Sequence, residues 1–273
     1  MRFVLLLAIA LALFLLLLWF TQRRLIYFPV REVPEPADIG WPELEQATFT
    51  AEDGVALHGW FAPAAGAPRD LAVLVHHGNG GNVVHRLDLL EHLSQAGLHV
   101  LVYDYRGYGR SAGSPSEAGL YRDGRAAQAW LLARTGLPPE RLVQYGESLG
   151  CAVALELAVG APAPPRAVVL QAPFTSLADA AGTHYPWLPV RVLLRDRFDN
   201  AGKIGRLRAP LLVLHGTHDG IVPPEHGREL LRRAMAAAPA RLVEVPRRGH
   251  NDLWSDARAR TADVTGFLDA LPR

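Results

Sequence analysis

The chain alternates short apolar runs with longer stretches of helical periodicity, and this alternation limits its fold more than any other feature. The apolar runs lie at 71–75, 99–103, 142–145, 167–170, 211–214 and 242–245. Amphipathic segments of helical length lie between them, at 84–96, 117–134, 151–159 and 225–237. Strands that are apolar along their whole length are buried on both faces, as in a parallel sheet covered by helices. The sequence therefore predicts an α/β fold with a doubly wound, mostly parallel sheet.

Two segments depart from this alternation. Residues 48–50 and 55–61, joined through an Asp-Gly pair, predict an antiparallel hairpin at one edge of the sheet. Residues 172–208 contain no clear strand, and prolines and aromatic residues gather at 184–189. A segment of this length in a compact domain is usually functional or partly helical. We therefore expect one domain over 47–273 with a cap insertion around 172–208, and the alternative is a surface excursion without a role.

The N-terminal segment is strongly apolar. Residues 4–20 carry no charge and contain no strong helix breaker. A helix of this length, at about 1.5 Å per residue, nearly crosses a bilayer core of about 30 Å, and Trp19, Arg23 and Arg24 lie where interfacial residues are found. We expect an uncleaved single-pass anchor over 1–24. A cleaved signal peptide is the alternative, although no small-x-small cleavage site precedes the arginines.

A proline-rich connector follows the apolar segment, with prolines at 29, 34, 36 and 42. We expect residues 25–46 to form a stiff tether and the core to begin only after them. Positive charges flank the span at both ends, so the positive-inside rule leaves the side of the membrane open. We expect the domain itself to be a monomer.

The composition is that of a globular protein. Of 273 residues 49% are hydrophobic and 20% are charged, and the net charge is +1. These values exclude a disordered chain and give no reason to expect nucleic acid as a partner. Lys203 is the only lysine, a bias typical of GC-rich bacterial genomes, so we expect the bacterial inner membrane. Cys151 is the only cysteine, so the sequence predicts no internal disulfide.

One motif combines a nucleophile with a change from strand to helix. Residues 146–150 match the pattern G-x-S-x-G and lie directly between the run 142–145 and the helical segment 151–159. Such a turn is so sharp that the serine takes a strained backbone conformation, and the glycines remove side chains that would collide. The context predicts Ser148 as an exposed nucleophile, with the Leu149 N–H in the first helical turn available to an oxyanion.

The same pattern occurs a second time, at residues 109–113. Residues 106–108 (Arg-Gly-Tyr) separate that copy from its strand, and Ser-Pro-Ser follows it, so no helix can begin at its serine. We expect Ser111 to be a turn residue. The bare pattern is therefore a weak indicator, and the strand-turn-helix context singles out Ser148.

A serine nucleophile needs a base to take its proton and a carboxylate to orient that base. Asp219 lies on a tight turn after the run 211–214, and His250 follows the last apolar run. The order Ser, Asp, His is the one found with a G-x-S-x-G serine between a strand and a helix. The alternatives are that Asp219 only shapes its turn and that its neighbour His218 is the base, although a neighbour would point away. We expect His226 to be solvated.

An oxyanion needs a second backbone donor, and the glycine-rich loop at 76–82 follows the run 71–75. Its glycines let the main chain approach a reacting carbonyl. We expect the Asn79 N–H to be this donor, with Gly80 as the alternative. A phosphate-binding loop is a competing interpretation, but no Gly-Lys-Ser/Thr follows. A turn without a role is the other.

Several of these segments carry a family resemblance that covers nearly the whole chain. They are residues 77–82, 103–111 and 146–150, the turn at Asp219, and Gly249-His250. Together they resemble the α/β-hydrolase family. Residues 24–29, 116–121 and 171–174 resemble its membrane-anchored subfamily, which includes mammalian protein depalmitoylases and bacterial serine-aminopeptidase-like hydrolases.

The resemblance implies an α/β-hydrolase fold with about eight strands and a short cap. It also implies a catalytic triad and two oxyanion-hole amides, at Ser148, Asp219 and His250, and at Asn79 and Leu149 respectively. We expect two-step acyl transfer on an acyl ester or thioester, lipid-linked substrates included, without a metal or organic cofactor. The alternatives are a serine aminopeptidase-like peptidase and a non-catalytic binding protein, because members of one fold differ in chemistry.

Overall fold

The computed structural model describes residues 1–234 and 239–272. Its centre is a sheet of eight strands. These are β2 (Glu45–Thr50), β3 (Ala56–Ala62), β4 (Ala72–His76), β6 (His99–Asp104), β7 (Leu142–Glu147), β8 (Ala167–Gln171), β9 (Leu211–Gly216) and β10 (Ala240–Val245). Two short strands, β1 (Phe28–Pro29) and β5 (Gly80–Gly81), pair with each other outside this sheet.

The strand order is β10-β9-β8-β7-β4-β6-β3-β2. Every neighbouring pair from β10 to β6 is parallel, and β3 runs antiparallel to both β6 and β2. The chain winds from β4 to one side of the sheet through β6, and then returns to β7 on the other side of β4. In open α/β sheets a crevice forms at such a reversal, outside the carboxyl ends of the strands. The loops after β4 and β7 therefore face one crevice.

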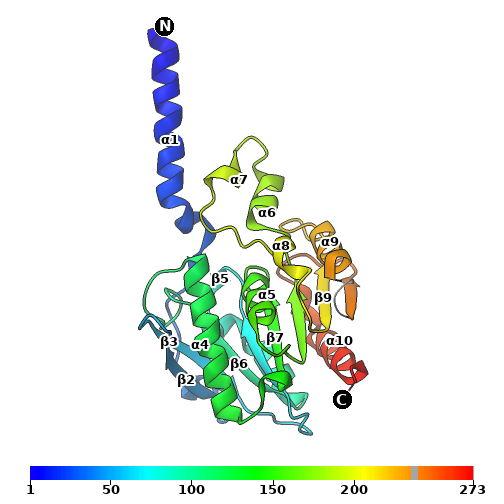
Figure 1. Cartoon of the computed structure of the whole chain (residues 1–273). Coiled ribbons are helices and arrows are strands. Elements are labelled where there is room, and N and C mark those ends of the chain that lie inside the picture. Colours follow the sequence, from blue (N-terminus) through cyan, green and yellow to red (C-terminus); the bar gives the residue numbers. More distant parts are fainter. Residues whose placement is uncertain (235–238, 273) are drawn as a thin grey trace.

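Helices cover both faces of the sheet (Figure 1). The helices of the domain are α2 (Pro36–Ile39), α3 (Leu87–Gln95), α4 (Glu117–Thr135), α5 (Gly150–Gly160), α6 (Leu177–His184), α7 (Val190–Leu193), α8 (Ala201–Ile204), α9 (Glu225–Ala234) and α10 (Ala257–Ala270), with short 3₁₀ turns η1 (Val83–Arg86), η2 (Pro139–Arg141) and η3 (Leu253–Asp256). Val73 and Val75 of β4 join the cluster under α3 and α10, whereas Leu74 joins the one under α4 and α5. The alternation of a strand's side chains thus builds a core on each face.

The predicted strands, and the hairpin that β2 and β3 form at the sheet edge, are confirmed. The fold is the α/β sheet of eight strands that the resemblance implies. All of residues 172–208 are described, and they contain α6, α7 and α8 but no strand, as expected. The helix expected at 225–237 is α9 as far as Ala234, and the last three of those residues lie outside the described part of the chain.

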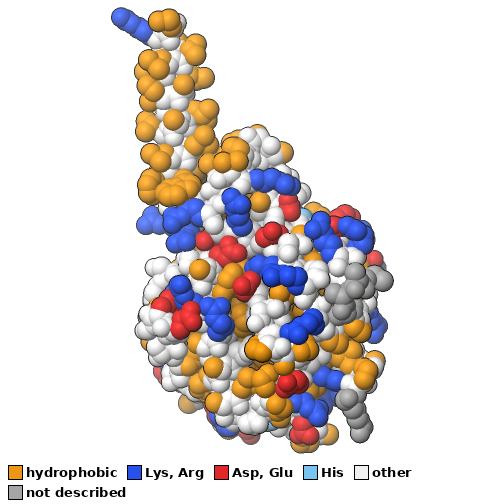
Figure 2. Space-filling view, viewed as in Figure 1, with side chains coloured by type: hydrophobic (Ala, Val, Ile, Leu, Met, Phe, Trp, Pro, Cys, Tyr) orange, Lys and Arg blue, Asp and Glu red, His pale blue; other side chains and the backbone are white. Residues whose placement is uncertain are grey.

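Helix α1 (Arg2–Ile26) projects from the domain with apolar side chains exposed along most of its length (Figures 1 and 2). It is six residues longer at its C-terminal end than the apolar run that ends at Phe20. Among the described residues it is the one helix long and apolar enough to cross a membrane, a test that a signal sequence also passes.

The expectation that the core begins only after residue 46 is wrong. Ile26 and Tyr27 are buried in the same cluster as Leu74. β1 pairs in parallel with β5, which is part of the glycine-rich loop 76–82. The connector begins with apolar residues that can reach the core before its prolines, and burial of each large apolar side chain stabilises the fold by about 1.5–3 kcal/mol. The chain enters the domain at the last turn of α1.

Candidate active site

Ser148 lies at the turn between β7 and α5 with a backbone φ of 50°. This left-handed conformation is strained for a residue with a side chain. A Cβ on Gly146 would lie 2.5 Å from the Cα of Cys151, and one on Gly150 would lie 1.9 Å from the carbonyl oxygen of His76. Both glycines are therefore required by close backbone approach, as the sequence pattern predicts.

Three side chains that are far apart in the sequence form one hydrogen-bonded chain. Nε2 of His250 lies 2.9 Å from Oγ of Ser148, and Nδ1 of His250 lies 2.7 Å from Oδ2 of Asp219. Because a carboxylate only accepts, Nδ1–H donates to Asp219, and Nε2 is left to accept the hydroxyl proton of Ser148. This is the tautomer that a general base for the serine needs.

The Asp219 carboxylate is held by several donors. Oδ1 accepts from the backbone N–H groups of Ile221 and Val222 at 2.9 and 2.8 Å. Burial favours the neutral acid, but hydrogen bonds from His215 and His250 outweigh it and hold the pKa of Asp219 well below its ordinary value. Asp219 is therefore ionised at neutral pH and can stabilise a protonated His250.

His215 is a site residue that the sequence reasoning missed. It is fully buried at the end of β9, and its Nε2–H donates to the carbonyl of Val222 at 2.8 Å while lying 3.3 Å from Oδ2 of Asp219. His215 thus contacts both Asp219 and Val222 in the turn that carries the acid. A histidine as the second-last residue of a buried strand, four positions before the acid, was the available signal.

Asn79 and Leu149, whose backbone N–H groups are the expected oxyanion donors, both line the cavity that contains Ser148. Neither backbone N–H donates a hydrogen bond to any acceptor in residues 1–234 or 239–272. Three hydrogen bonds fix the side chain and the backbone carbonyl of Asn79. Its side-chain amide donates to the carbonyl of Ile26 at 2.9 Å, and its carbonyl accepts from the Phe28 N–H at 2.9 Å and the Tyr108 hydroxyl at 2.7 Å. The end of α1 and the residue Phe28 after it therefore hold Asn79, the expected oxyanion donor, in place.

An ion pair links this loop to the serine turn, and the sequence reasoning missed it as well. Nε and Nη2 of Arg86 donate to the two carboxylate oxygens of Glu147 at 2.9 and 2.8 Å. Nη1 of Arg86 donates to the carbonyl of Gly80 at 3.1 Å. One guanidinium thus joins the residue before Ser148 to the residue after Asn79.

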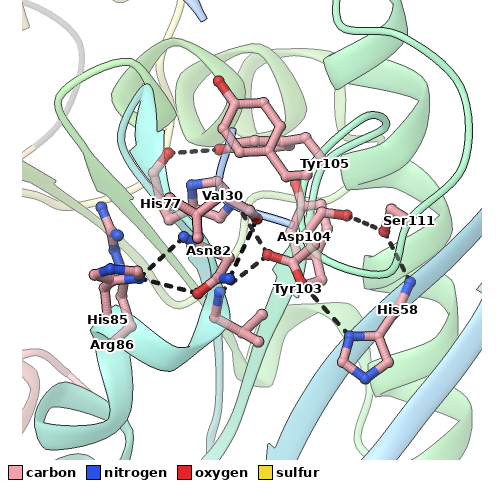
Figure 3. Close-up of polar contacts among 12 residues, drawn as sticks. Val30, His58, His77, Asn82, His85, Arg86, Tyr103, Asp104, Tyr105 and Ser111 are labelled. Carbon is pink, nitrogen blue, oxygen red and sulfur yellow. Dashed lines mark hydrogen bonds and ion pairs between the residues drawn. The ribbon is translucent and has the colours of Figure 1, made fainter. Parts of the chain in front are cut away.

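Ser111 takes no part in this site. It is fully buried, its hydroxyl donates to the carbonyl of Asp104 at 2.7 Å, and it accepts from the His58 N–H at 3.0 Å (Figure 3). Its own N–H closes a turn with the Tyr108 carbonyl. The prediction that Ser111 is a turn residue is confirmed.

Two other histidines close to Asp219 in the sequence, His218 and His226, make no contact with Ser148. His218 is exposed, and its ring contacts the Thr217 hydroxyl at 3.2 Å instead of Ser148. His226 is half-buried, with Nδ1 2.8 Å from the Thr175 hydroxyl, so the expectation that it is solvated is wrong. A contact with the segment after β8 covers it, which the sequence of α9 alone does not show.

The cavity at Ser148 has a volume of about 990 Å³. His250, Asn79 and Leu149 line it together with the serine. Two further segments form apolar walls. The first is the end of α1 and the residues after it, with Leu25, Ile26, Phe28 and Val30. The second is the segment 172–208, here called the cap, with Leu177, Ala180, Ala181 and Leu194. Neither segment is part of the sheet, and the site has room for a long apolar substituent.

Known proteins share the fold of this chain. A family model described as the alpha/beta hydrolase fold matches residues 72–202. The uncharacterised protein Rv2307c of Mycobacterium tuberculosis is 44% identical over 95% of this chain and 89% of its own length. The chain belongs to the α/β-hydrolase family.

One relative of this α/β hydrolase and one solved structure of the same fold have names that state an activity. The lysophosphatidylserine lipase ABHD12 of Danio rerio is 30% identical over 77% of this chain and 65% of its own length. The structure of the Pyrococcus furiosus esterase Pf2001 aligns with a TM-score of 0.72 over 89% of this chain and 97% of the esterase, at 21% identity, which shows the shared fold. The fold and the relatives together support a hydrolase that is consistent with the membrane subfamily.

Proposed function

We propose that this α/β hydrolase is a serine hydrolase that cleaves acyl ester or thioester bonds, with Ser148 as nucleophile, His250 as base and Asp219 as acid. The hydrogen-bonded chain from Asp219 through His250 to Ser148 is the observation that carries the proposal. Serine hydroxyls are weak nucleophiles until an oriented base takes their proton.

The proposed reaction has two steps. Ser148 Oγ attacks the carbonyl carbon while Nε2 of His250 takes the hydroxyl proton, and the N–H groups of Asn79 and Leu149 stabilise the oxyanion. Collapse of the intermediate breaks the bond to the alcohol or thiol, which leaves with the proton from His250. Water then adds to the acyl-enzyme with His250 again as base, releasing the carboxylic acid and restoring Ser148.

The apolar walls of the cavity favour an acyl group of some length as the substrate. Burying an acyl chain contributes about 0.8 kcal/mol per methylene. The lipase name of one relative and the esterase name of one structural neighbour support the same class of substrate.

We further propose that α1 is retained as a single-pass membrane anchor. Gln22 of its last turns is buried, and Nε of Arg23 donates to the buried carboxylate of Asp196 at 2.9 Å. The last turns of α1 are thus part of the folded domain, and cleavage beyond Arg23 would remove both of these residues. N-terminal sequencing of the mature membrane-bound protein tests this, and a start within the domain would contradict it.

The substrate class is tested with a panel: p-nitrophenyl esters of increasing chain length, an acyl thioester and aminoacyl anilides. We expect kcat/KM to rise with chain length and the anilides to be poor substrates. A clear preference for the anilides would identify an aminopeptidase-like enzyme instead. No turnover of any substrate, together with no labelling by a fluorophosphonate, would favour a binding protein.

A further inference from the structure

The cap exposes large apolar side chains at its far end. In the segment 185–192, here called the cap tip, Tyr185, Trp187 and Val192 have 52%, 69% and 80% of their surface exposed. In the described part of the chain, every other exposed large apolar residue lies in α1, at Met1 or Phe28 on either side of it, or at Ile221. Contiguous exposed apolar surface marks an interaction site. All of this surface gathers in one region of the protein.

The cap tip is fixed beside the last turns of α1. The Gln22 side chain donates to the carbonyl of Leu193 at 3.1 Å and accepts from the Arg195 N–H at 2.8 Å. The Arg195 guanidinium lies 4.7 Å from the ring centre of Trp19. The segment that ends α7 is therefore level with residues 19–22 of the helix.

Other contacts hold the cap to the catalytic side of the domain. The Asp196 carboxylate accepts from Arg23 at 2.9 Å and from the Tyr27 hydroxyl at 3.0 Å. On the opposite side of the cap, the His184 ring donates to the carbonyl of Ile221, in the turn that carries the acid, at 2.8 Å. The residues on both sides of the cap tip are thus bonded to the rest of the protein, to the acid turn at His184 and to α1 at Leu193, Arg195 and Asp196.

Figure 1 shows this α6–α7 segment rising beside the C-terminal part of α1, and Figure 2 shows hydrophobic side chains over its top with charged side chains beneath. A helix of 25 residues is about 37 Å long, slightly more than a hydrocarbon core of about 30 Å. If α1 spans a bilayer, its last turns lie at the interface. A segment that rises beside those turns must then enter the same zone.

The residues of this zone suit that position. Trp19 and Trp187 are of the type enriched at the membrane interface, and arginine heads such as those of Arg24 and Arg195 reach lipid phosphates. An exposed Val192 gains by transfer from water into the acyl boundary.

We propose that the cap tip is a second membrane contact, and that its occupant is the bilayer that α1 enters. The inference rests on the proposed anchor and deepens the proposed function. The walls of the cavity come from the last turn of α1, at Leu25 and Ile26, and from the cap, at Leu177 and Leu194. Both contributors stand at the membrane, so a lipid acyl chain passes from the bilayer into the cavity between them.

The contact is tested by placing a probe on the cap tip of the full chain. Cys151 is the only cysteine and is buried, so an environment-sensitive fluorophore attaches to an introduced cysteine. Val192→Cys carries the probe at the cap tip, and Glu140→Cys carries it on η2, after the far end of α4, as the matched control. Both labelled proteins are reconstituted in vesicles of phosphatidylcholine and phosphatidylglycerol.

In vesicles, we expect the Val192 probe to emit at a shorter wavelength than the same fluorophore in aqueous buffer. Iodide in the aqueous phase should quench it little, and spin-labelled lipid should quench it strongly. The Glu140 probe should show none of these changes. Equal quenching of both probes by iodide would overturn the proposal. This measurement needs no enzymatic activity, so it separates the failure of the membrane contact from the failure of the proposed chemistry.

A second measurement tests delivery of the substrate. The double variant Trp187→Ser, Val192→Ser should lower kcat/KM on a lipid ester embedded in the vesicles by about tenfold relative to a short water-soluble ester, because delivery loses binding energy of order 1.4 kcal/mol. An unchanged ratio would contradict delivery through the cap. If the wild-type protein hydrolyses neither ester, the proposed function fails while the probe result stands.

Discussion

Arg86 and Glu147 form a two-bond ion pair that fixes the glycine-rich loop against the turn that presents Ser148. Both side chains are partly shielded from water, with 10% and 25% of their surface exposed, and the third bond of Arg86 goes to Gly80. The two amides expected at the oxyanion lie on the two elements that this pair joins. Their spacing therefore depends on this ion pair.

We predict that Arg86→Ala lowers kcat by about tenfold to a hundredfold with little change in KM, because a small displacement of oxyanion donors is costly in the transition state. Arg86→Lys should recover only part of the loss, since lysine cannot make the paired bonds. Arg125→Ala, which breaks an exposed pair with Glu52, is the control and should leave kcat unchanged. Equal kcat in Arg86→Ala and wild type would show that the pair has no positioning role.

Asp219→Asn tests the acid. We predict a loss of kcat of about 10³- to 10⁴-fold, because asparagine favours the wrong tautomer of His250 and leaves the imidazolium without a counter-charge. His250→Ala should be more damaging. Steady-state kinetics with a short ester, together with circular dichroism to check folding, measures both. Retention of more than about a tenth of kcat in a folded Asp219→Asn would rule out this role for the carboxylate.

Two truncations distinguish the contribution of the apolar span from that of the last turns of α1. Removal of residues 1–20 should leave a competent domain, because Gln22 and Arg23 keep their partners in the cap. Removal of residues 1–24 leaves the buried Asp196 with Tyr27 as its remaining side-chain partner. We predict that the longer truncation lowers the free energy of unfolding by about 1–3 kcal/mol more and reduces activity. Urea unfolding and ester hydrolysis measure the difference. Equal stability and activity of the two truncated proteins would show that residues 21–24 only connect the span to the domain.

His76 predicts a dependence of stability on pH. Burial lowers its pKa to about 4, against a hydrogen bond with Gln144 that raises it, whereas a histidine in an unfolded chain has a pKa of about 6.5. Between these two values the unfolded chain binds a proton that the folded protein does not, so the free energy of unfolding falls as pH drops. The loss at this site is of the order of 3 kcal/mol between pH 6.5 and 4.

Urea unfolding at several pH values checks this. The variant His76→Gln should lower stability at neutral pH but show a shallower fall on acidification than the wild-type protein. His92→Gln, at a partly exposed position on α3, is the control and should keep the wild-type slope. An undiminished slope in His76→Gln would place the acid sensitivity elsewhere, with the buried His77 as the next residue to replace.

The sheet and the contact of Ser148 with His250 and Asp219 could be anticipated because they follow from local patterns. Apolar runs predict buried strands, G-x-S-x-G predicts a strained turn when a strand precedes it and a helix follows, and residues after parallel strands meet at one edge. The positive φ of Ser148 agrees with this reasoning.

The remaining contacts depend on which distant segments meet. Ile26 and Asn79 are 53 positions apart, and Arg23 and Asp196 are 173 apart, so no local pattern pairs them. The burial of Tyr27 likewise follows from the cap and the core together, not from the prolines around it. Arg86 is an ordinary polar residue in sequence, and only its hydrogen bonds to Glu147 and Gly80 reveal that it holds the site.

The central claim is that Ser148 is the activated nucleophile, and labelling with a fluorophosphonate probe tests it most directly. Only a serine that a base has activated reacts appreciably with such a probe. We predict that the wild-type protein and Ser111→Ala are labelled and hydrolyse esters, whereas folded Ser148→Ala does neither. Labelling that persists in Ser148→Ala would contradict the assignment.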